Sequence, residues 1–184
     1  MLLGSLPKGD KARESFVDWK KEYIEKLNSQ IPDVKIVHGD KISDSVGPEL
    51  VVGHDLWLLK EADILIVNAR SKVGAGTAQE MVLAKYFKKP VISVIPKDSH
   101  HRRSNVVFDG ENVEDWIHPF LFVSSDLIVE TIDEAIPWIN SSKKNPSKTK
   151  VKDISVFDKL IVKFEKELRK TMEKYIKDEL SIKN

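Results

Sequence analysis

The chain of 184 residues contains no cysteine. This absence excludes disulfides, thiolate nucleophiles and cysteine-ligated zinc or iron–sulfur clusters. No apolar run approaches the roughly 20 residues that span a bilayer, so no membrane partner is expected. Residues 1–5 form a short apolar run without a preceding basic region or a cleavage site, which predicts a strand rather than a signal peptide. These features predict a cytoplasmic protein.

An excess of charge of one sign is also missing. The 30 Lys and Arg residues are balanced by 29 Asp and Glu residues, so the formal net charge is only +1. Such a balance gives no electrostatic footprint for a nucleic-acid polymer. The chain is long enough for one ordinary domain with a substantial core, plus a short appendage. We therefore expect a small-molecule ligand rather than DNA or RNA.

Strand and helix patterns alternate along most of the chain. Strands are expected at residues 1–5, 34–37, 63–67, 91–95 and 119–123, and helices at 13–28, 77–88 and 126–139, with another helix ending at 61. The runs DILIV at 63–67 and VISVI at 91–95 are typical of strands that are buried on both faces. Residues 96–117 are expected to be irregular. This order predicts an α/β three-layer sandwich with about five parallel strands.

The last part of the chain differs from this pattern. The segment SSKKNPSKTK at 141–150 has no apolar residue except Pro146 and predicts a linker. In residues 151–184, apolar positions recur at spacings of three, four and seven, which predicts a long C-terminal amphipathic helix. The expected organisation is a domain at 1–140, a linker and this helix. The apolar stripe suits either packing on the same domain or a subunit interface, and the sequence leaves both open.

In open parallel sheets, ligands bind outside the carboxyl ends of the strands. The most informative loop there is GAGTAQE at 74–80, because its glycines let the backbone approach a ligand and a helix N-terminus offers unpaired N–H groups. It lacks the Gly-Lys-Ser/Thr ending of a Walker loop and the third glycine of a dinucleotide fingerprint. Thr77 and Glu80 also have the spacing of a capping box, which would require no function.

A longer pattern accompanies this turn. It comprises Gly4-Ser5 after the first strand, Asp55-Leu56, Ala62-Asp63 before an apolar strand, Gly76-Thr77-Ala78-Gln79-Glu80, and Lys89-Pro90-Val91. Over residues 1–140 the chain resembles the nucleoside 2-deoxyribosyltransferase family, which includes the related nucleoside 5′-monophosphate N-glycosidases. The resemblance implies a flavodoxin-like, doubly wound fold. It also implies an enzyme of nucleotide salvage that cleaves the N-glycosidic bond of a (deoxy)nucleoside or its 5′-monophosphate, by hydrolysis or base exchange.

The resemblance also assigns roles to individual residues. Glu80 becomes the catalytic carboxylate that meets the anomeric carbon, and Asp55 orients Glu80, holds a sugar hydroxyl or protonates the leaving base. The substrate-binding residues are Gly4, Ser5, Asn68, Gly74, Gly76 and Thr77. Glu80 is expected to be ionised at neutral pH, because the reference pKa of Glu is about 4.3 and a helix N-terminus favours the anion. For Asp55, the alternative is a structural role as a helix N-cap.

One departure leaves base recognition open. The transferases usually have an acidic residue six positions before the catalytic Glu, where it meets the base, and this chain has Gly74 there. Hydrolysis and base exchange therefore both remain possible. An alternative is a ribonucleotide phosphoribohydrolase of the cytokinin-activating type, although Lys72-Val73 stands where that family has Pro-Gly-Gly. A non-catalytic nucleotide-binding module is the other alternative.

Cations for a 5′-phosphate are available, and no cofactor is expected. The candidate cations are Lys8, Lys11, His100, His101, Arg102 and Arg103. We expect no bound metal, because adjacent histidine side chains do not usually converge on one ion. The resemblance further implies a homodimer or a larger oligomer, in which segment 98–119 reaches the pocket of a neighbouring subunit.

Overall fold

The chain divides into two compact units, Met1–Asp153 and Ile154–Asn184. The computed structural model describes residues 1–7, 10–169 and 172. Within the described residues of the first unit, a parallel sheet is packed between helices, and an antiparallel hairpin is inserted after its third strand. The α/β class and the parallel sheet predicted from the sequence are therefore confirmed.

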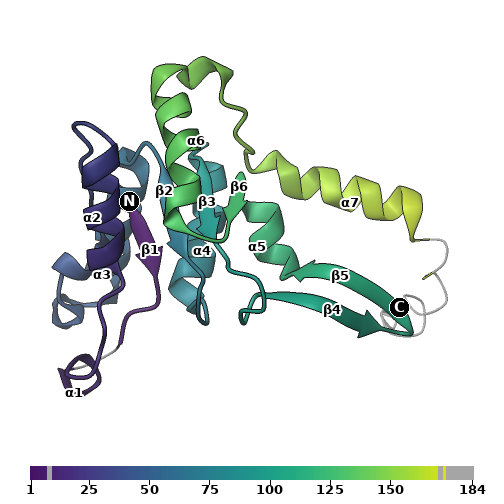
Figure 1. Cartoon of the computed structure of the whole chain (residues 1–184), viewed down its shortest axis with the longest axis horizontal. Helices are drawn as coiled ribbons and strands as arrows, with labels where there is room; N and C mark the ends of the chain where they lie inside the picture. The colour runs from purple at the N-terminus through teal and green to yellow at the C-terminus, as the bar shows by residue number, and fades with distance from the viewer. Residues whose placement is uncertain (8–9, 170–171, 173–184) are drawn as a thin grey trace, which may run out of the picture. The chain divides into compact units, whose positions relative to one another are not determined.

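The sheet has four paired strands instead of the expected five. These are β1 (Leu2–Gly4), β2 (Leu65–Asn68), β3 (Val91–Val94) and β6 (Leu127–Val129), in the order β1-β2-β3-β6 (Figure 1). The strand expected at 34–37 is reduced to one parallel bridge between Leu2 and His38. This edge segment pairs on one side only and is partly exposed, so little holds it in a longer ladder. With the bridge counted, the order is compatible with a flavodoxin-like layout.

Two apolar clusters lie on opposite faces of the sheet. On one face, β1, β2 and β3 pack against α3 (Pro48–Glu61), α4 (Ala75–Tyr86) and α5 (Pro119–Ser124). On the other face, the sheet packs against α2 (Lys20–Gln30) and α6 (Ile132–Lys144). The side chains of successive strand residues point to opposite faces of the sheet. Leu3 therefore belongs to the first cluster and Leu2 to the second. The first unit is thus a three-layer sandwich.

The region between β3 and β6 differs most from expectation. Residues 96–117, expected to be irregular, contain the antiparallel strands β4 (Arg102–Phe108) and β5 (Glu111–Ile117). Asp109 and Gly110 join them with positive φ angles of 49° and 85°, as the tight turns of two-residue hairpins require. The strand expected at 119–123 is wrong. Pro119 occupies the start of helix α5 instead, where its missing N–H costs nothing.

The boundaries of several helices also shift. A short helix α1 (Asp10–Arg13) precedes α2, which begins at Lys20 instead of residue 13. Helix α6 begins at Ile132, because Leu127–Val129, expected to be helical, form β6. The hydroxyl of Thr131 caps this helix by accepting a hydrogen bond from the Glu134 N–H at 3.4 Å.

The end of the first unit lies beyond the expected linker. Helix α6 continues to Lys144, and the Lys152 N–H donates to the Asp126 carboxylate at 2.7 Å. In the second unit, α7 (Ser155–Glu167) has an amphipathic sequence with exposed apolar residues such as Ile161 and Val162. The expected long helix over 151–184 is not confirmed, because α7 ends at Glu167 and residues 170–171 and 173–184 lie outside the described residues. No helix within the described ranges is long and apolar enough to cross a membrane.

Candidate functional site

The loops that follow β1 and β2 meet at the carboxyl edge of the sheet. Ser5 follows β1, and its hydroxyl donates to the carbonyl of Lys72 at 2.5 Å. The same hydroxyl oxygen lies 3.8 Å from the position that a Cβ would take at Gly74. Parallel strands bring their carboxyl ends to one edge, so the loops after β1 and β2 lie close together there.

Gly4 and Asn68 have structural partners at this edge. A Cβ at Gly4 would lie 2.6 Å from Cζ2 of Trp19, so only glycine leaves room for the indole. The Asn68 side-chain oxygen accepts hydrogen bonds from the hydroxyl of Tyr23 at 3.3 Å and from Nε of Arg70 at 3.2 Å. Both residues end their strands, and their contacts with Trp19, Tyr23 and Arg70 give each of them a structural role.

The glycine turn does not form the capping box that its sequence allows. Helix α4 begins at Ala75 with Gly74 as its N-cap, and this cap makes no side-chain hydrogen bond. Thr77 therefore lies inside the first turn of α4, and it is only 6% exposed. A Cβ at Gly76 would meet no atom within 4 Å, so the turn has open space beside it. The structural explanation for Glu80 as part of a cap is thereby removed.

Glu80 and Asp55 form a pair of interacting carboxyl groups. Burial, followed by the negative charge of Asp55, raises the pKa of Glu80 to about 7. The expectation that a helix terminus would favour the anion is wrong. Glu80 lies in the second turn of α4, beyond the first turn where the helix dipole acts.

Asp55 lies inside helix α3, whose N-cap is Gly47, so the alternative of an N-cap role is also wrong. Its carboxylate is 3.1 Å from Nδ1 of His54. A Cβ at Gly39 would lie 2.6 Å from the Asp55 Oδ1 atom, so a larger residue there would displace this carboxylate. The carboxylate of Asp55 is thus held against the loop that follows the His38 bridge.

His101 holds the glycine turn from the other side. The Val73 N–H donates to Nε2 of His101 at 2.9 Å, and the His101 residue is 8% exposed. Burial, together with the charges of His100 and His118, lowers the pKa of His101 to about 4. The imidazole is therefore neutral at pH 7, and it acts as an acceptor for the loop rather than as a cation for a phosphate.

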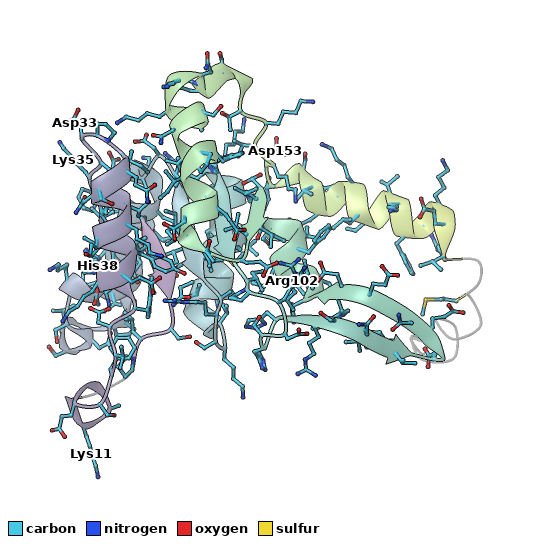
Figure 2. The ribbon with its side chains drawn as sticks, viewed as in Figure 1. Lys11, Asp33, Lys35, His38, Arg102 and Asp153 are labelled. Atoms are coloured by element: carbon cyan, nitrogen blue, oxygen red, sulfur yellow. The ribbon has the colours of Figure 1, made fainter. Side chains whose placement is uncertain are left out.

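The other candidate cations are placed differently. Arg102, labelled in Figure 2, donates to both carboxylate oxygens of Asp115 at 2.8 Å, so its charge is compensated. His100 and Arg103 are exposed and line a cavity of about 430 Å³ near the hairpin base. Lys11 is exposed on α1, and Lys8 lies outside the described residues. Within the described ranges, no group of three His, Asp or Glu side chains is arranged to hold a metal ion.

The structure also shows a charged pocket that sequence reasoning missed. Lys20 is 3% exposed, and its Nζ lies 2.8 Å from Asp18 and 3.0 Å from Asp40. These three residues line a pocket of about 110 Å³ together with Leu6, Pro7 and Phe16. The loop His38-Gly39-Asp40 follows a predicted strand and was expected at the ligand-binding edge, but no role was predicted for Asp40. Asp18 and Lys20 fell inside the helix expected at 13–28, where alternating charges are usually solvent-exposed.

Comparison with known proteins adds no family assignment. No known family model matches the chain, and no curated protein matches it significantly. The features that bear on function are the contact of Ser5 with the glycine turn at the carboxyl edge of the sheet and the interaction of Glu80 with Asp55.

Proposed function

We propose that this protein cleaves the N-glycosidic bond of a (deoxy)nucleoside or its 5′-monophosphate, as the nucleoside 2-deoxyribosyltransferases and related N-glycosidases do. The observation that carries the proposal is the interaction of Glu80 with Asp55, which together with burial raises the pKa of Glu80 to about 7. Carboxyl groups perturbed by burial and a charged neighbour are typical of functional sites. Two carboxyl groups at one site are also what cleavage at an anomeric carbon uses.

In the proposed reaction, Glu80 and Asp55 have different tasks. The ionised Glu80 carboxylate attacks C1′ of the sugar while the C1′–N bond breaks and its electron pair passes to the base nitrogen. A water molecule supplies the proton that the departing base requires, and the negatively charged Asp55 orients Glu80 or holds a sugar hydroxyl. Water then attacks C1′ and releases Glu80, which gives the free sugar. If a second base attacks instead, the product is a new nucleoside.

The proposed reaction requires no cofactor. We also propose that the protein is an oligomer, in which a neighbouring subunit contributes to each site. The hairpin of β4 and β5 exposes apolar side chains, with Val107 63% and Phe108 46% exposed. Exposed apolar surface of this kind is commonly covered by a partner. We expect a homodimer or larger at assay concentration, measured by sedimentation velocity. A fully active monomer would contradict the subunit arrangement while leaving the reaction intact.

Incubation with 2′-deoxynucleosides and their 5′-monophosphates tests the proposed reaction, with the released base separated by chromatography. Base release in buffer alone identifies a hydrolase, whereas release only with an added acceptor base identifies a transferase. Preference for ribonucleotide monophosphates would favour the phosphoribohydrolase alternative. Tight nucleotide binding by calorimetry without base release would identify a binding module and exclude the enzymatic proposal.

The dependence of the reaction on pH follows from the titration of Glu80. The nucleophile must be ionised, so kcat/KM should rise through pH 7, where the pKa of Glu80 lies, and level off above it. Asp55→Asn removes the charge that is the smaller cause of the raised pKa of Glu80. The midpoint of the pH profile should therefore move to lower pH, although kcat/KM itself should fall. A wild-type rate that decreases above pH 7 would show that Glu80 acts as an acid instead.

A further inference from the structure

The charged pocket at Lys20 is lined partly by the loops that follow β1 and the His38 bridge. Leu6 and Pro7 follow Ser5, which bonds to the glycine turn. Asp40 follows Gly39, the residue that touches the carboxylate of Asp55. The pocket therefore adjoins the carboxylate of Asp55 through residues 39–40, and it adjoins the glycine turn through residues 5–7.

The floor of the pocket combines one buried cation with two accessible carboxylates. The side chain of Lys20 is 4% exposed, whereas those of Asp18 and Asp40 are 32% and 20% exposed. Asp18 Oδ1 also accepts from the Lys20 N–H at 3.1 Å, and Nδ1 of His38 contacts the Oδ1 atom of Asp40. A carboxylate offers about four acceptor positions, so both keep capacity for a ligand.

The charge of the floor is negative at neutral pH. Burial lowers the pKa of His38, and the charges of Lys20 and Lys41 lower it further. These causes together favour the neutral form of His38, labelled in Figure 2, over the form whose charge would offset the second carboxylate. A ligand that brings N–H donors to Asp18 and Asp40 would complement this floor, whereas a ligand that brings oxygen acceptors would be repelled.

The size and walls of the pocket suit one flat ring system, such as a single nucleobase. Its volume is about 110 Å³. Sites for whole drug-sized ligands are larger, about 300–1,000 Å³. Phe16 offers an aromatic wall, with the Lys20 ammonium 5.6 Å from its ring centroid, and Leu6 and Pro7 add apolar surface. Such walls suit the faces of a heteroaromatic ring, and the charged floor suits its polar edge.

We propose that this pocket holds the base of the substrate and favours bases that carry an exocyclic amino group. The proposal rests on the proposed function. Asp18 and Asp40 supply the carboxylates that meet the base, in a chain where Gly74 stands at the position of the transferases' acidic residue. Amino groups of cytosine and adenine are N–H donors, whereas the corresponding carbonyl groups of uracil and hypoxanthine are acceptors.

Pairs of substrates that differ only in this group test the proposal. Wild-type kcat/KM should favour deoxycytidine over deoxyuridine, and deoxyadenosine over deoxyinosine, by at least about tenfold, the scale of hydrogen-bonded base discrimination. Asp18→Asn and Asp40→Asn should each reduce these ratios by at least about threefold, mainly through the amino substrate. The matched control is Asp33→Asn, an exposed carboxylate beyond the other end of α2, which should keep the wild-type ratios (Figure 2).

A binding measurement separates this proposal from the proposed function. Free cytosine and uracil are titrated calorimetrically into the Glu80→Gln protein, which keeps the pocket. If the Glu80→Gln protein binds cytosine and the double variant Glu80→Gln/Asp40→Asn does not, the assignment of the pocket as a base site is supported even when no nucleoside is cleaved. Cleavage of both members of each pair at equal rates overturns the pocket and leaves the reaction standing. Failure of free cytosine to bind better than uracil also overturns it.

A second variant covers the case in which the aspartate variants do not fold. Phe16→Leu keeps every charge of the pocket and removes only the aromatic wall. This variant should raise KM for every nucleoside substrate, most strongly for those with the larger purine bases. Its melting temperature should equal that of the wild type. Unchanged KM values for every substrate would overturn the proposal.

Discussion

Replacing Glu80 with glutamine should lower turnover by at least about a thousandfold, the order expected when a principal catalytic group is lost. Glutamine keeps the size and the polar character of the side chain but removes the anion that meets the anomeric carbon. Because Glu80 is not part of a helix cap, the substitution should not unfold the protein. Activity and stability should therefore respond in different ways to this single change.

The stability of the same variant should depend on pH in a predictable direction. The pKa of Glu80 is raised from 4.5 to about 7 in the folded state, so folding favours its protonated form. Wild-type stability should fall as pH rises between these two values, because the folded state must then give up a proton that it binds more tightly. Glu80→Gln removes this loss, so the variant should be more stable than wild type at pH 8 and similar at pH 4.

Urea unfolding at both pH values and a cleavage assay check these expectations together. Glu61→Gln provides the matched control, because it makes the same chemical change at an exposed carboxylate at the end of α3. That control should leave both turnover and the pH dependence of stability unchanged. If Glu80→Gln lowered the melting temperature while cleavage continued near the wild-type rate, Glu80 would be structural, and the catalytic assignment would move to Asp55.

Replacing Asp126 with alanine should be the most destabilising single change in the first unit. The side chains of Lys85 and Asp126 are 0% and 1% exposed and form an ion pair. Asp126 also accepts from the N–H groups of Val91 and Lys152, both at 2.7 Å. Its removal leaves a buried ammonium without its counter-charge, which costs about 3–5 kcal/mol in proteins. The free energy of unfolding should fall by this amount.

Unfolding at different pH values and two further variants test whether the unpaired Lys85 ammonium causes the loss of stability in Asp126→Ala. The destabilisation by Asp126→Ala should shrink as pH rises, because the buried Lys85 amine can then lose its proton, which burial already favours in the wild type. Asp126→Asn keeps an oxygen for the backbone N–H groups and should cost less. Lys97→Ala removes an exposed pair with Glu130 at 3.7 Å and should cost less than about 1 kcal/mol. Equal losses for Asp126→Ala and Lys97→Ala would contradict the assignment.

A strand or helix was predicted correctly where a few neighbouring residues were enough to indicate it. β2 and β3 were predictable because continuous apolar runs over a few residues indicate strands buried on both faces. The segment at 119–123 was also short and apolar, and such runs do not distinguish a strand from a buried helix. The structure gives the place beside β3 to Leu127–Val129, so residues 119–123 form α5. The Asp109-Gly110 turn was a local hairpin signal that the prediction did not use.

For the candidate site, the glycine turn and the two carboxyl groups were identified from residue types and spacing, with roles taken from a family resemblance. Their electrostatics were not predictable. A reference pKa describes an isolated side chain, whereas burial and the nearby Asp55 raise the pKa of Glu80 to about 7. The Lys20 pocket was missed because Asp40 comes from another segment and meets Asp18 and Lys20 only in the fold.

The sequence by itself determined the α/β class, the parallel sheet and the loops at its carboxyl edge, because apolar periodicity and turn residues act over a few positions. Only the tertiary structure decided which segment pairs beside β3, how Glu80 titrates, and that Asp18, Lys20 and Asp40 share one pocket. These properties depend on packing, burial and charge between residues far apart in sequence. Such interactions exist only once the chain has folded.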